Sequence, residues 1–419
     1  VSAHPDLPVG TSVETPKIGR LAYGLPESVG LSSDKLKTID SIAQEAIDQK
    51  MTPGMQILVA KKGKIVYRKN FGTLDYNPAH KVNDHTIYDL ASLTKILATL
   101  PELMRLYTKG DFRPNDTFED LLPRLKDTNK GGMTMKEVLS HYAQFQSWIP
   151  FFNQTLDKNK KPLPEFYSTT PSDSFPTQVA KDLYLREGFT DSIYKRIDDS
   201  NLIKDKKYLY SDLPYYYFKL FIEKKTKKPL QEAVQKHFYR ELGAYQLTYL
   251  PLERFPITNI APAEDEKTFR GQELRGYVHD QGAALLGGVG GHAGLFGTAD
   301  DVAKMMQMYL QKGYYGGTWY LQPQAIQLFN TCNYCTEGNR RGLGFDKPQL
   351  GKAGPTCGCV PMESFGHTGF TGTFAWADPI NEIVVVFLSN RTYPSAENKL
   401  LINKLIRQRV QEVVYKAGL

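Results

Sequence analysis

A serine followed three residues later by a lysine can supply a nucleophile and its proton acceptor when both lie on one helical face. Ser92 and Lys95 have this spacing within the largely apolar segment 88–98. Burial of a lone lysine disfavours its charged form, and the neutral amine accepts a proton. A buried lysine held by an ion pair is the alternative. We expect Ser92 to be a nucleophile and Lys95 its proton-handling partner, with Tyr210 and His367 as further catalytic residues and alternative candidates for the base.

The same spacing occurs twice more in the chain. Ser32 and Lys35 stand at the start of a charged helix, and Ser192 and Lys195 lie among acidic and basic residues. Charged, polar surroundings are typical of exposed helix faces. We therefore interpret both of these pairs as surface residues.

Two further polar motifs could complete a hydrolytic site. Tyr210 and Asp212 stand two positions apart in a polar turn. His367, Thr368 and Gly369 come directly before a strand-forming run, 370–376, and glycines let a strand edge approach bound substrate closely. Taken alone, such a tyrosine usually packs in the core and such a histidine is usually structural.

The first part of the chain predicts elements that could position these residues. An apolar stripe from Leu36 to Ile47 indicates a helix, with Ser32 or Ser33 as its cap. Met55–Ala60 and Lys64–Phe71 are typical of two strands joined by a tight turn.

The last part of the chain mirrors this pattern. Gly372–Ala377 and Glu382–Asn390 are rich in strand-forming residues, and an apolar stripe over 401–414 predicts a C-terminal helix. The fold class expected is α+β, an antiparallel sheet flanked by N- and C-terminal helices with an inserted, mainly helical lobe.

The domain boundaries follow from these patterns. We expect an extended arm over 1–30, a sheet lobe made of 31–100 and 320–419, and an inserted helix- and loop-rich lobe over 101–319. The chain begins with Val1 and without a signal peptide, which predicts a processed form or a piece of a longer polypeptide.

Composition narrows the class of protein. The 419 residues carry a net charge of +7, but the short lysine clusters lie among polar residues and no nucleic-acid motif accompanies them. No run approaches the roughly 18 apolar residues of a membrane span. We expect no nucleic-acid partner, no membrane span and no cofactor.

Four cysteines lie near the third motif. Their spacing is compatible with two disulfides, with a structural zinc site remote from the chemistry, or with free thiols. Each alternative makes the group a loop-stabilising feature, and no catalytic metal is expected. The residues are Cys332, Cys335, Cys357 and Cys359.

In order and spacing, the three motifs resemble those of the serine β-lactamase and penicillin-binding-protein (DD-peptidase) superfamily, especially its class C and esterase-like branch. The resemblance spans about residues 30–415 and implies a cleft between the sheet and the helical lobe. It implies that Ser92 attacks a carbonyl while Lys95 and Tyr210 share acid–base work. It also implies an oxyanion hole made by the N–H groups of Ser92 and Phe370, with Phe370 on the edge strand.

The chain departs from that family pattern twice. Asp212 stands where asparagine is usual, and His367 stands where lysine is usual. The histidine form is familiar among esterases, amidases and aminopeptidases of the superfamily. A carboxylate at 212 repels the anionic group of β-lactams and favours an amide or amine.

Other segments resemble one branch more closely. The glycine-rich stretch 287–296 with His292, the preceding His279 and Asp280, and the segment from Trp148 are similar to N-acetylmuramoyl-L-alanine amidase-type members. The leading arm resembles the junction to a family-3 β-N-acetylglucosaminidase, which implies a linked upstream glycosidase domain. We expect Trp148 to stack on a sugar or to be buried, and His292 to line the cleft or bond locally.

This resemblance implies a hydrolase of peptidoglycan turnover in the periplasm or another extracytoplasmic part of the bacterial envelope. The expected substrate is the amide between N-acetylmuramic acid and the stem peptide. Alternatives are a DD-peptidase or D-aminopeptidase, a β-lactamase, a small-ester esterase, and a non-catalytic wall-binding module. His141, which follows the run 133–140, is expected to cap a helix in the core.

Overall fold

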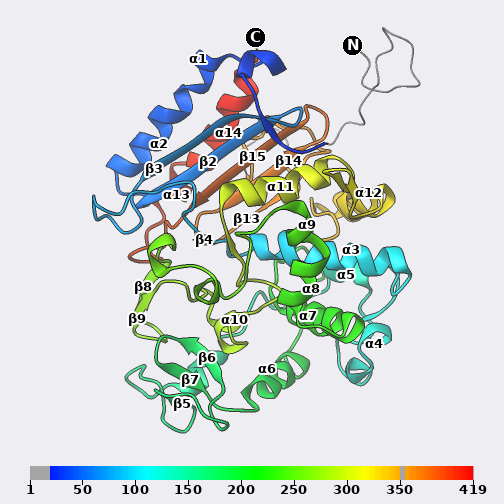
Figure 1. The fold of residues 1–419 in the computed structure, drawn as a ribbon. Helices are drawn as coiled ribbons and strands as arrows, with labels where there is room; N and C mark the ends of the chain where they lie inside the picture. Colours follow the sequence, from blue (N-terminus) through cyan, green and yellow to red (C-terminus); the bar gives the residue numbers. More distant parts are fainter. Residues whose placement is uncertain (1–18, 350–353, 419) are drawn as a thin grey trace, which may run out of the picture.

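The computed structural model of the chain describes residues 19–349 and 354–418 (Figure 1). In these residues the largest sheet has six strands in the order β1-β3-β2-β15-β14-β13, all neighbours antiparallel except β1 and β3. The strands are β1 (Ala22–Tyr23), β2 (Gly54–Lys61), β3 (Lys64–Gly72), β13 (Phe365–Thr368), β14 (Phe374–Asp378) and β15 (Ile383–Ser389). The α+β fold expected from the sequence is confirmed.

The hairpin of β2 and β3 follows the sequence prediction within one or two residues. Lys62 and Gly63 both have positive φ, 52° and 74°, as a two-residue turn of the primed type requires. Along β2 the side chains alternate, because Met55, Ile57 and Val59 join one core cluster and Leu58 joins the other.

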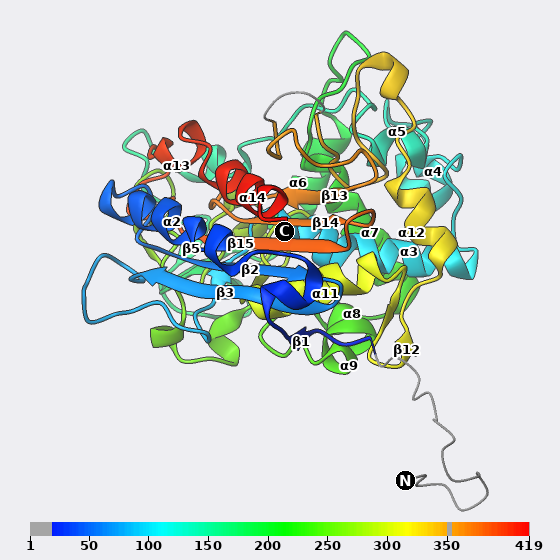
Figure 2. The same cartoon turned by 90° about the horizontal axis from the view of Figure 1, so that it is seen from above.

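Helices from both ends of the chain cover one face of the sheet. Figure 2 shows α2 (Thr38–Asp48) and α14 (Ile406–Lys416) side by side over the strands. Ser32 caps the short α1 (Ser33–Leu36), because its Oγ accepts from the Lys35 N–H. The stripe predicted as one C-terminal helix is split at Leu405, whose φ of 53° separates α13 (Leu400–Asn403) from α14.

The other face of the sheet packs on α11 (Ala299–Leu310), which contacts β2, β14 and β15. By sequence α11 falls in the segment 101–319, yet it lies against the sheet. The expected arm 1–30 falls largely outside the described residues, and its described part forms β1 and a 3₁₀ turn, η1 (Pro26–Val29).

The remaining elements lie between β3 and β13 in the sequence. The helices are α3 (Leu100–Lys109), α4 (Phe118–Leu121), α5 (Met135–Leu139), α6 (Phe189–Asp198), α7 (Leu213–Thr226), α8 (Leu230–Val234), α9 (Arg240–Leu242), α10 (Gln281–Leu285) and α12 (Pro323–Asn330). The short strands are β4 (Tyr88–Asp89), β5 (Tyr167–Ser168), β6 (Thr177–Ala180), β7 (Leu183–Leu185), β8 (Glu264–Glu266), β9 (Gln272–Leu274), β10 (Phe296–Gly297), β11 (Tyr314–Tyr315) and β12 (Thr318–Trp319). Helical turns are η2 (Lys95–Thr99), η3 (Pro123–Leu125), η4 (Phe151–Thr155), η5 (Gln235–Tyr239), η6 (Pro251–Glu253), η7 (Ile257–Asn259) and η8 (Cys335–Glu337).

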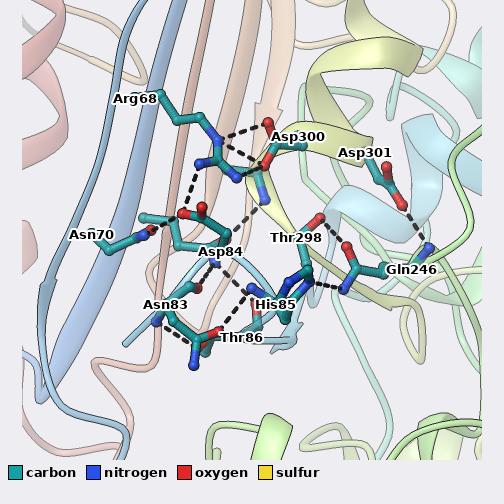
Figure 3. A network of polar contacts seen from close by, with 12 residues as sticks. Arg68, Asn70, Asn83, Asp84, His85, Thr86, Gln246, Thr298, Asp300 and Asp301 are labelled. Atoms are coloured by element: carbon teal, nitrogen blue, oxygen red, sulfur yellow. Dashed lines mark hydrogen bonds and ion pairs between the residues drawn. The ribbon is translucent and has the colours of Figure 1, made fainter. Parts of the chain in front are cut away.

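A polar network joins the sheet to α11. Figure 3 shows Arg68 of β3 between Asp84 and Asp300. Its Nε–H is shared between the two Asp300 oxygens at 2.9 Å, Nη2 donates to Asp300 Oδ2 at 2.5 Å, and Nη1 lies 2.7 Å from Asp84. Such paired geometry is stronger than an exposed ion pair, so this network helps to fix α11 on the strands.

Within residues 19–349 and 354–418, no helix combines the length and the apolar character that crossing a membrane requires. The cysteines in this part of the chain form two disulfides, Cys332–Cys335 and Cys357–Cys359. The zinc and free-thiol alternatives are therefore wrong for these residues.

Candidate active site

Ser92 stands at the end of a sharp turn that a buried carboxylate stabilises. Ala91 has a φ of 48°, a region that non-glycine residues rarely adopt, and its N–H donates to Asp89 Oδ1 at 2.8 Å. The other oxygen of Asp89 accepts from the His279 N–H at 2.7 Å. Burial raises the pKa of the Asp89 carboxyl. Asp89 thus holds the backbone just before the serine.

Two side chains donate hydrogen bonds to the Ser92 hydroxyl. Lys95 Nζ and Tyr210 Oη each lie 3.0 Å from Ser92 Oγ. Lys95 begins η2, a π-helical turn, and π turns in other proteins are frequently found at functional sites. The Ser-x-x-Lys pair and the tyrosine therefore meet as the spacing predicts.

Lys95 is fully buried, and its amine contacts three oxygens. Nζ lies 3.0 Å from Ser92 Oγ, 3.0 Å from the His292 carbonyl and 2.7 Å from Asp212 Oδ1. The first two contacts are hydrogen bonds, and the third is an ion pair without hydrogen-bond geometry, because Asp212 Oδ1 has no hydrogen-bond partner among the described residues. The lone, unpaired lysine assumed from the sequence is therefore wrong, because Asp212, far away in the sequence, forms the ion pair set out as its alternative.

Tyr210 is held in place by a histidine. The His141 ring lies 4.7 Å from the Tyr210 ring, and His141 Nδ1 accepts from the Ser211 N–H at 3.2 Å. Burial, followed by the charge of Asp212, raises the pKa of the Tyr210 phenol well above its usual value. His141 was expected to cap helix α5, but the C-cap is Ser140 and His141 follows it with a φ of 53°. Its contact with Tyr210 was not foreseen.

The third motif is brought to Ser92 by close backbone packing. A Cβ on Gly369 would lie 2.7 Å from the Leu90 carbonyl oxygen, so only glycine permits this approach. Thr373 Oγ1 donates to the same carbonyl at 3.0 Å, and Thr371 Oγ1 donates to the Asp89 carbonyl at 2.8 Å. The turn after β13 thus lies directly against the segment that precedes Ser92.

Phe370 was expected on the edge strand, and this placement is wrong. Strand β13 ends at Thr368, and the Gly369 N–H bonds across the turn to the Thr373 carbonyl at 2.8 Å. Gly372, with a φ of 100°, closes the turn. Phe370 therefore lies in the β13–β14 turn, 55% exposed. Within the described residues, neither its N–H nor that of Ser92 donates a backbone hydrogen bond.

His367 is buried, and both of its ring nitrogens have partners. Nδ1 lies 2.7 Å from the Thr368 carbonyl, and Nε2 lies 3.0 Å from Arg341 Nη1. Because Arg341 can only donate to Nε2 and the Thr368 carbonyl can only accept from Nδ1, the contacts fit a neutral ring that is protonated on Nδ1. Burial, with the charges of Arg341 and Lys95, lowers the pKa of His367 well below its usual value.

Arg341 is a residue that the sequence reasoning missed. It contacts His367, and its guanidinium carbon lies 5.1 Å from the centre of the Tyr210 ring. Asp346 pairs with it at 3.4 Å and with Arg340 at 2.9 Å. No motif marks Arg341, because it stands in the irregular segment between η8 and β13.

The glycine-rich stretch forms the wall behind Lys95. A Cβ on Gly291 would lie 2.2 Å from the Tyr215 carbonyl oxygen, so the stretch packs tightly on α7. The His292 ring stacks on Tyr216 with centres 4.4 Å apart, and its Nε2 lies 2.7 Å from Asp280. Burial would raise the pKa of Asp280, but His292 holds it well below its usual range.

These residues line one cleft of about 850 Å³. Trp148 is 57% exposed at this cleft, so the buried alternative for this side chain is wrong. His279 pairs with Glu264 at 2.8 Å, and its ring lies 5.4 Å from the Phe370 ring. The lining includes Ser92, Trp148, Tyr210, Asp212, His279, Asp280, His292, His367, Thr368, Gly369 and Phe370.

The arrangement supplies a hydroxyl with two proton-transfer partners and unpaired backbone donors nearby, which suits attack on a carbonyl. Among the described residues, no group of three or more histidine, cysteine, aspartate or glutamate side chains is placed to hold a metal ion.

Comparisons with known proteins agree with this geometry. The family model described as Beta-lactamase matches residues 39–407. A protein of Escherichia coli (strain K12) named "Putative D-alanyl-D-alanine carboxypeptidase" is 30% identical, over 92% of this chain and 89% of its own. A protein of the same name from Salmonella enteritidis PT4 is 29% identical, over 90% of this chain and 88% of its own.

Solved structures share the fold. A penicillin-binding protein homologue from Caulobacter crescentus superposes with a TM-score of 0.65 at 16% identity, covering 93% of this chain and 99% of its own. EstCE1, described as a hydrolase with promiscuous acyltransferase activity, also superposes with a TM-score of 0.65. It is 18% identical and covers 91% of this chain and 99% of its own. Together with the family match, these likenesses show that the chain belongs to the β-lactamase and penicillin-binding-protein family and is a serine hydrolase.

Proposed function

We propose that the chain is a DD-carboxypeptidase that releases the terminal D-alanine of peptidoglycan stem peptides through an acyl-enzyme on Ser92. The observation that carries the proposal is the convergence of Lys95 Nζ and Tyr210 Oη on Ser92 Oγ, each at 3.0 Å. A serine hydroxyl is a weak nucleophile, and such partners are what activates it.

The two partners divide the proton transfer. Ser92 Oγ attacks the carbonyl carbon, and its proton moves to Lys95, which must first be in the amine form. The Tyr210 phenol is protonated, because burial and Asp212 raise its pKa, so it can donate to the leaving amine. The N–H groups of Ser92 and Phe370 receive the oxyanion. Water then hydrolyses the ester by the reverse sequence.

His367 has a positioning role in this scheme. Its Nε2 accepts from Arg341 and its Nδ1 faces the Thr368 carbonyl, so neither nitrogen is available to Ser92. The histidine fixes the strand that carries Thr368 and Gly369 beside the substrate. The choice of base therefore falls on Lys95.

The carboxypeptidase substrate is supported by the relatives named "Putative D-alanyl-D-alanine carboxypeptidase". The relative from Escherichia coli (strain K12) matches along 92% of this chain. From this proposed activity we also propose that the protein acts outside the cytoplasm, in the cell envelope, because the substrate lies there. The two disulfides agree with such an oxidising compartment.

A second candidate is the N-acetylmuramoyl-L-alanine amidase reaction. The exposed Trp148 at the cleft favours it, because an accessible indole can stack on a sugar ring. In that case the acyl group on Ser92 is the lactyl group of N-acetylmuramic acid. A linked upstream glycosidase domain belongs with this candidate.

One digestion separates the two candidates. Purified muropeptides that carry a pentapeptide are incubated with the protein and with Ser92→Ala, and the products are weighed. Release of D-alanine, absent with Ser92→Ala, is the expected result. Release of the intact stem peptide instead favours the amidase and overturns the carboxypeptidase.

A further inference from the structure

His279 lines the cleft that contains Ser92, and a carboxylate orients its ring. Its Nε2 lies 2.8 Å from Glu264 Oε2, and because a carboxylate only accepts, Nε2 carries the ring proton. Nδ1 is then an acceptor. It makes no hydrogen bond within the described residues and is not enclosed by the protein, so it is open to the cleft. A histidine held in this way by a carboxylate has the arrangement of a general base.

The other two histidines of the cleft lack such a nitrogen. Both ring nitrogens of His367 have partners. His292 contacts Asp280 through Nε2, and its Nδ1 is buried inside the protein. Among the described histidines that line the cleft, His279 is therefore the one whose ring is free to accept a proton from a bound molecule.

A buried ion pair holds the main chain at His279. Arg270 donates from Nη1 to the Val278 carbonyl at 2.6 Å and from Nη2 to the His279 carbonyl at 2.7 Å. Glu266 accepts from Arg270 Nε at 3.1 Å, and both side chains are fully buried. Glu264 and Glu266 are the two ends of β8, so one short strand fixes both the ring and the main chain of His279. Such support holds a side chain in position before the reaction begins.

The same segment is bonded to the turn that carries the nucleophile. The His279 N–H donates to Asp89 Oδ2 at 2.7 Å, and Asp89 Oδ1 accepts from the Ala91 N–H at 2.8 Å. The His279 ring also lies 5.4 Å from the Phe370 ring, beside the N–H to which the oxyanion was assigned. The imidazole therefore adjoins the place of the acyl carbonyl.

Hydrolysis of the acyl-enzyme needs an acceptor for the proton of the attacking water. Lys95 has taken the serine proton during acylation. The Tyr210 phenol is a base only after it has given up its own proton, and burial raises its pKa well above the usual value. A neutral imidazole accepts a proton near neutral pH, which makes it the suitable group for this step.

We propose that His279, oriented by Glu264, is the general base that activates water for hydrolysis of the acyl-enzyme. The inference rests on the acyl-enzyme proposed at Ser92. The water oxygen bonds to the ester carbonyl carbon as its proton passes to Nδ1, and the bond from that carbon to Ser92 Oγ then breaks. Oγ takes a proton back from Lys95, and the imidazolium releases its proton to solvent. Support of the Phe370 turn is the competing role, and it affects acylation and deacylation alike.

The test separates the two steps with p-nitrophenyl acetate. The first turnover, seen as a burst of p-nitrophenolate, measures acylation, and the intact mass, followed after the excess ester is removed, measures loss of the acetyl group. In His279→Gln we expect acylation within about threefold of the native rate and deacylation slower by about a hundredfold or more. The acetyl-enzyme should accumulate, and KM should fall together with kcat. Equal slowing of both steps, or deacylation at the native rate, overturns the base.

A second variant tests the orienting carboxylate and does not depend on the folding of the first. Glu264→Gln keeps an oxygen that accepts from His279 Nε2 but removes the charge, so deacylation alone should slow by about tenfold or more. Deacylation of Glu264→Gln at the native rate would contradict this role. His80→Gln is the matched control, because His80 also pairs with a carboxylate, that of Asp75 at 2.8 Å, but lies outside the cleft. Both steps should keep their native rates in His80→Gln.

The outcomes distinguish this inference from the proposed substrate. Slow deacylation of His279→Gln, without D-alanine release by the native protein, leaves the base standing and overturns the carboxypeptidase. D-alanine release by the native protein, with equal slowing of both steps in His279→Gln, does the opposite.

Discussion

Lys95 Nζ lies 2.7 Å from Asp212 Oδ1, an ion pair whose lysine is fully buried beside the Ser92 hydroxyl. Asp212 occupies the position at which related motifs carry asparagine, so the chain has placed a negative charge in the cleft. That charge orients the amine that contacts Ser92. We expect it also to repel substrates whose anionic group approaches position 212.

Replacing this carboxylate tests the repulsion. Asp212→Asn keeps an oxygen that can accept from Lys95 but removes the charge. We expect the second-order rate constant for acylation by benzylpenicillin to rise by about tenfold, because a like charge at short range is removed. Asp205→Asn, an exposed carboxylate outside the cleft, should leave the rate unchanged. Unchanged or slower acylation of Asp212→Asn would mean that charge is not the barrier.

Burial and then the charge of Arg341 lower the pKa of His367, so removal of Arg341 should appear in the pH profile. Because Arg341 is one cause of the low pKa of His367, Arg341→Met lets that pKa rise towards 6.5. Protonation then begins at a higher pH, so the acid limb of kcat/KM should move upward. We also expect kcat/KM at neutral pH to fall by about tenfold or more.

Arg340→Met is the control for this shift, since Arg340 pairs with Asp346 but does not contact His367. The acid limb of the kcat/KM profile of Arg340→Met should move less than that of Arg341→Met. A profile for Arg341→Met identical in shape to that of the native protein would remove the link between the two residues.

Gly369 sets the distance between the third motif and Ser92. In Gly369→Ala the new Cβ would lie 2.0 Å from Thr373 Oγ1 and 2.7 Å from the Leu90 carbonyl oxygen, so the turn must move. We expect kcat/KM to fall by about a hundredfold, because small misplacements are costly in catalysis. Gly132→Ala, which meets nothing within 4 Å, should retain full activity. Equal activity of both variants would contradict the close approach.

The Arg68 network should matter for stability alone. Arg68→Met removes paired hydrogen bonds to Asp300, and we expect the free energy of unfolding to fall by about 1–2 kcal/mol in urea titration. Lys37→Met breaks the exposed pair with Asp34 and should not change stability measurably. A kcat/KM that falls together with stability would place the network in the site.

Local patterns in the sequence were sufficient for much of the fold and for the approach of Lys95 to Ser92. Strands β2 and β15 are largely apolar runs bounded by turn residues, β3 follows β2 across a tight turn, and Ser92 lies one helical turn from Lys95 in an apolar segment. The features that failed depend on contacts between distant segments. The pairing of Lys95 with Asp212, the contact of Arg341 with His367 and the bond from the His279 N–H to Asp89 arise only when separate segments meet in space.

The strand ends were less predictable for a related reason. The run 370–376 is rich in strand-forming residues, but the hydrogen bond from Gly369 to Thr373 makes its first part a turn. Tertiary packing of this turn on Leu90 overrides the local preference. The C-terminal stripe similarly breaks at Leu405, whose positive φ no local pattern signals.

The role of Ser92 is tested most directly by weighing the intact protein after treatment with a fluorophosphonate. The native chain should gain the mass of one phosphonyl adduct, located by peptide mapping on residue 92, and Ser92→Ala should gain none. A native chain that stays unmodified, or an adduct that persists in Ser92→Ala, would contradict the assignment of the nucleophile.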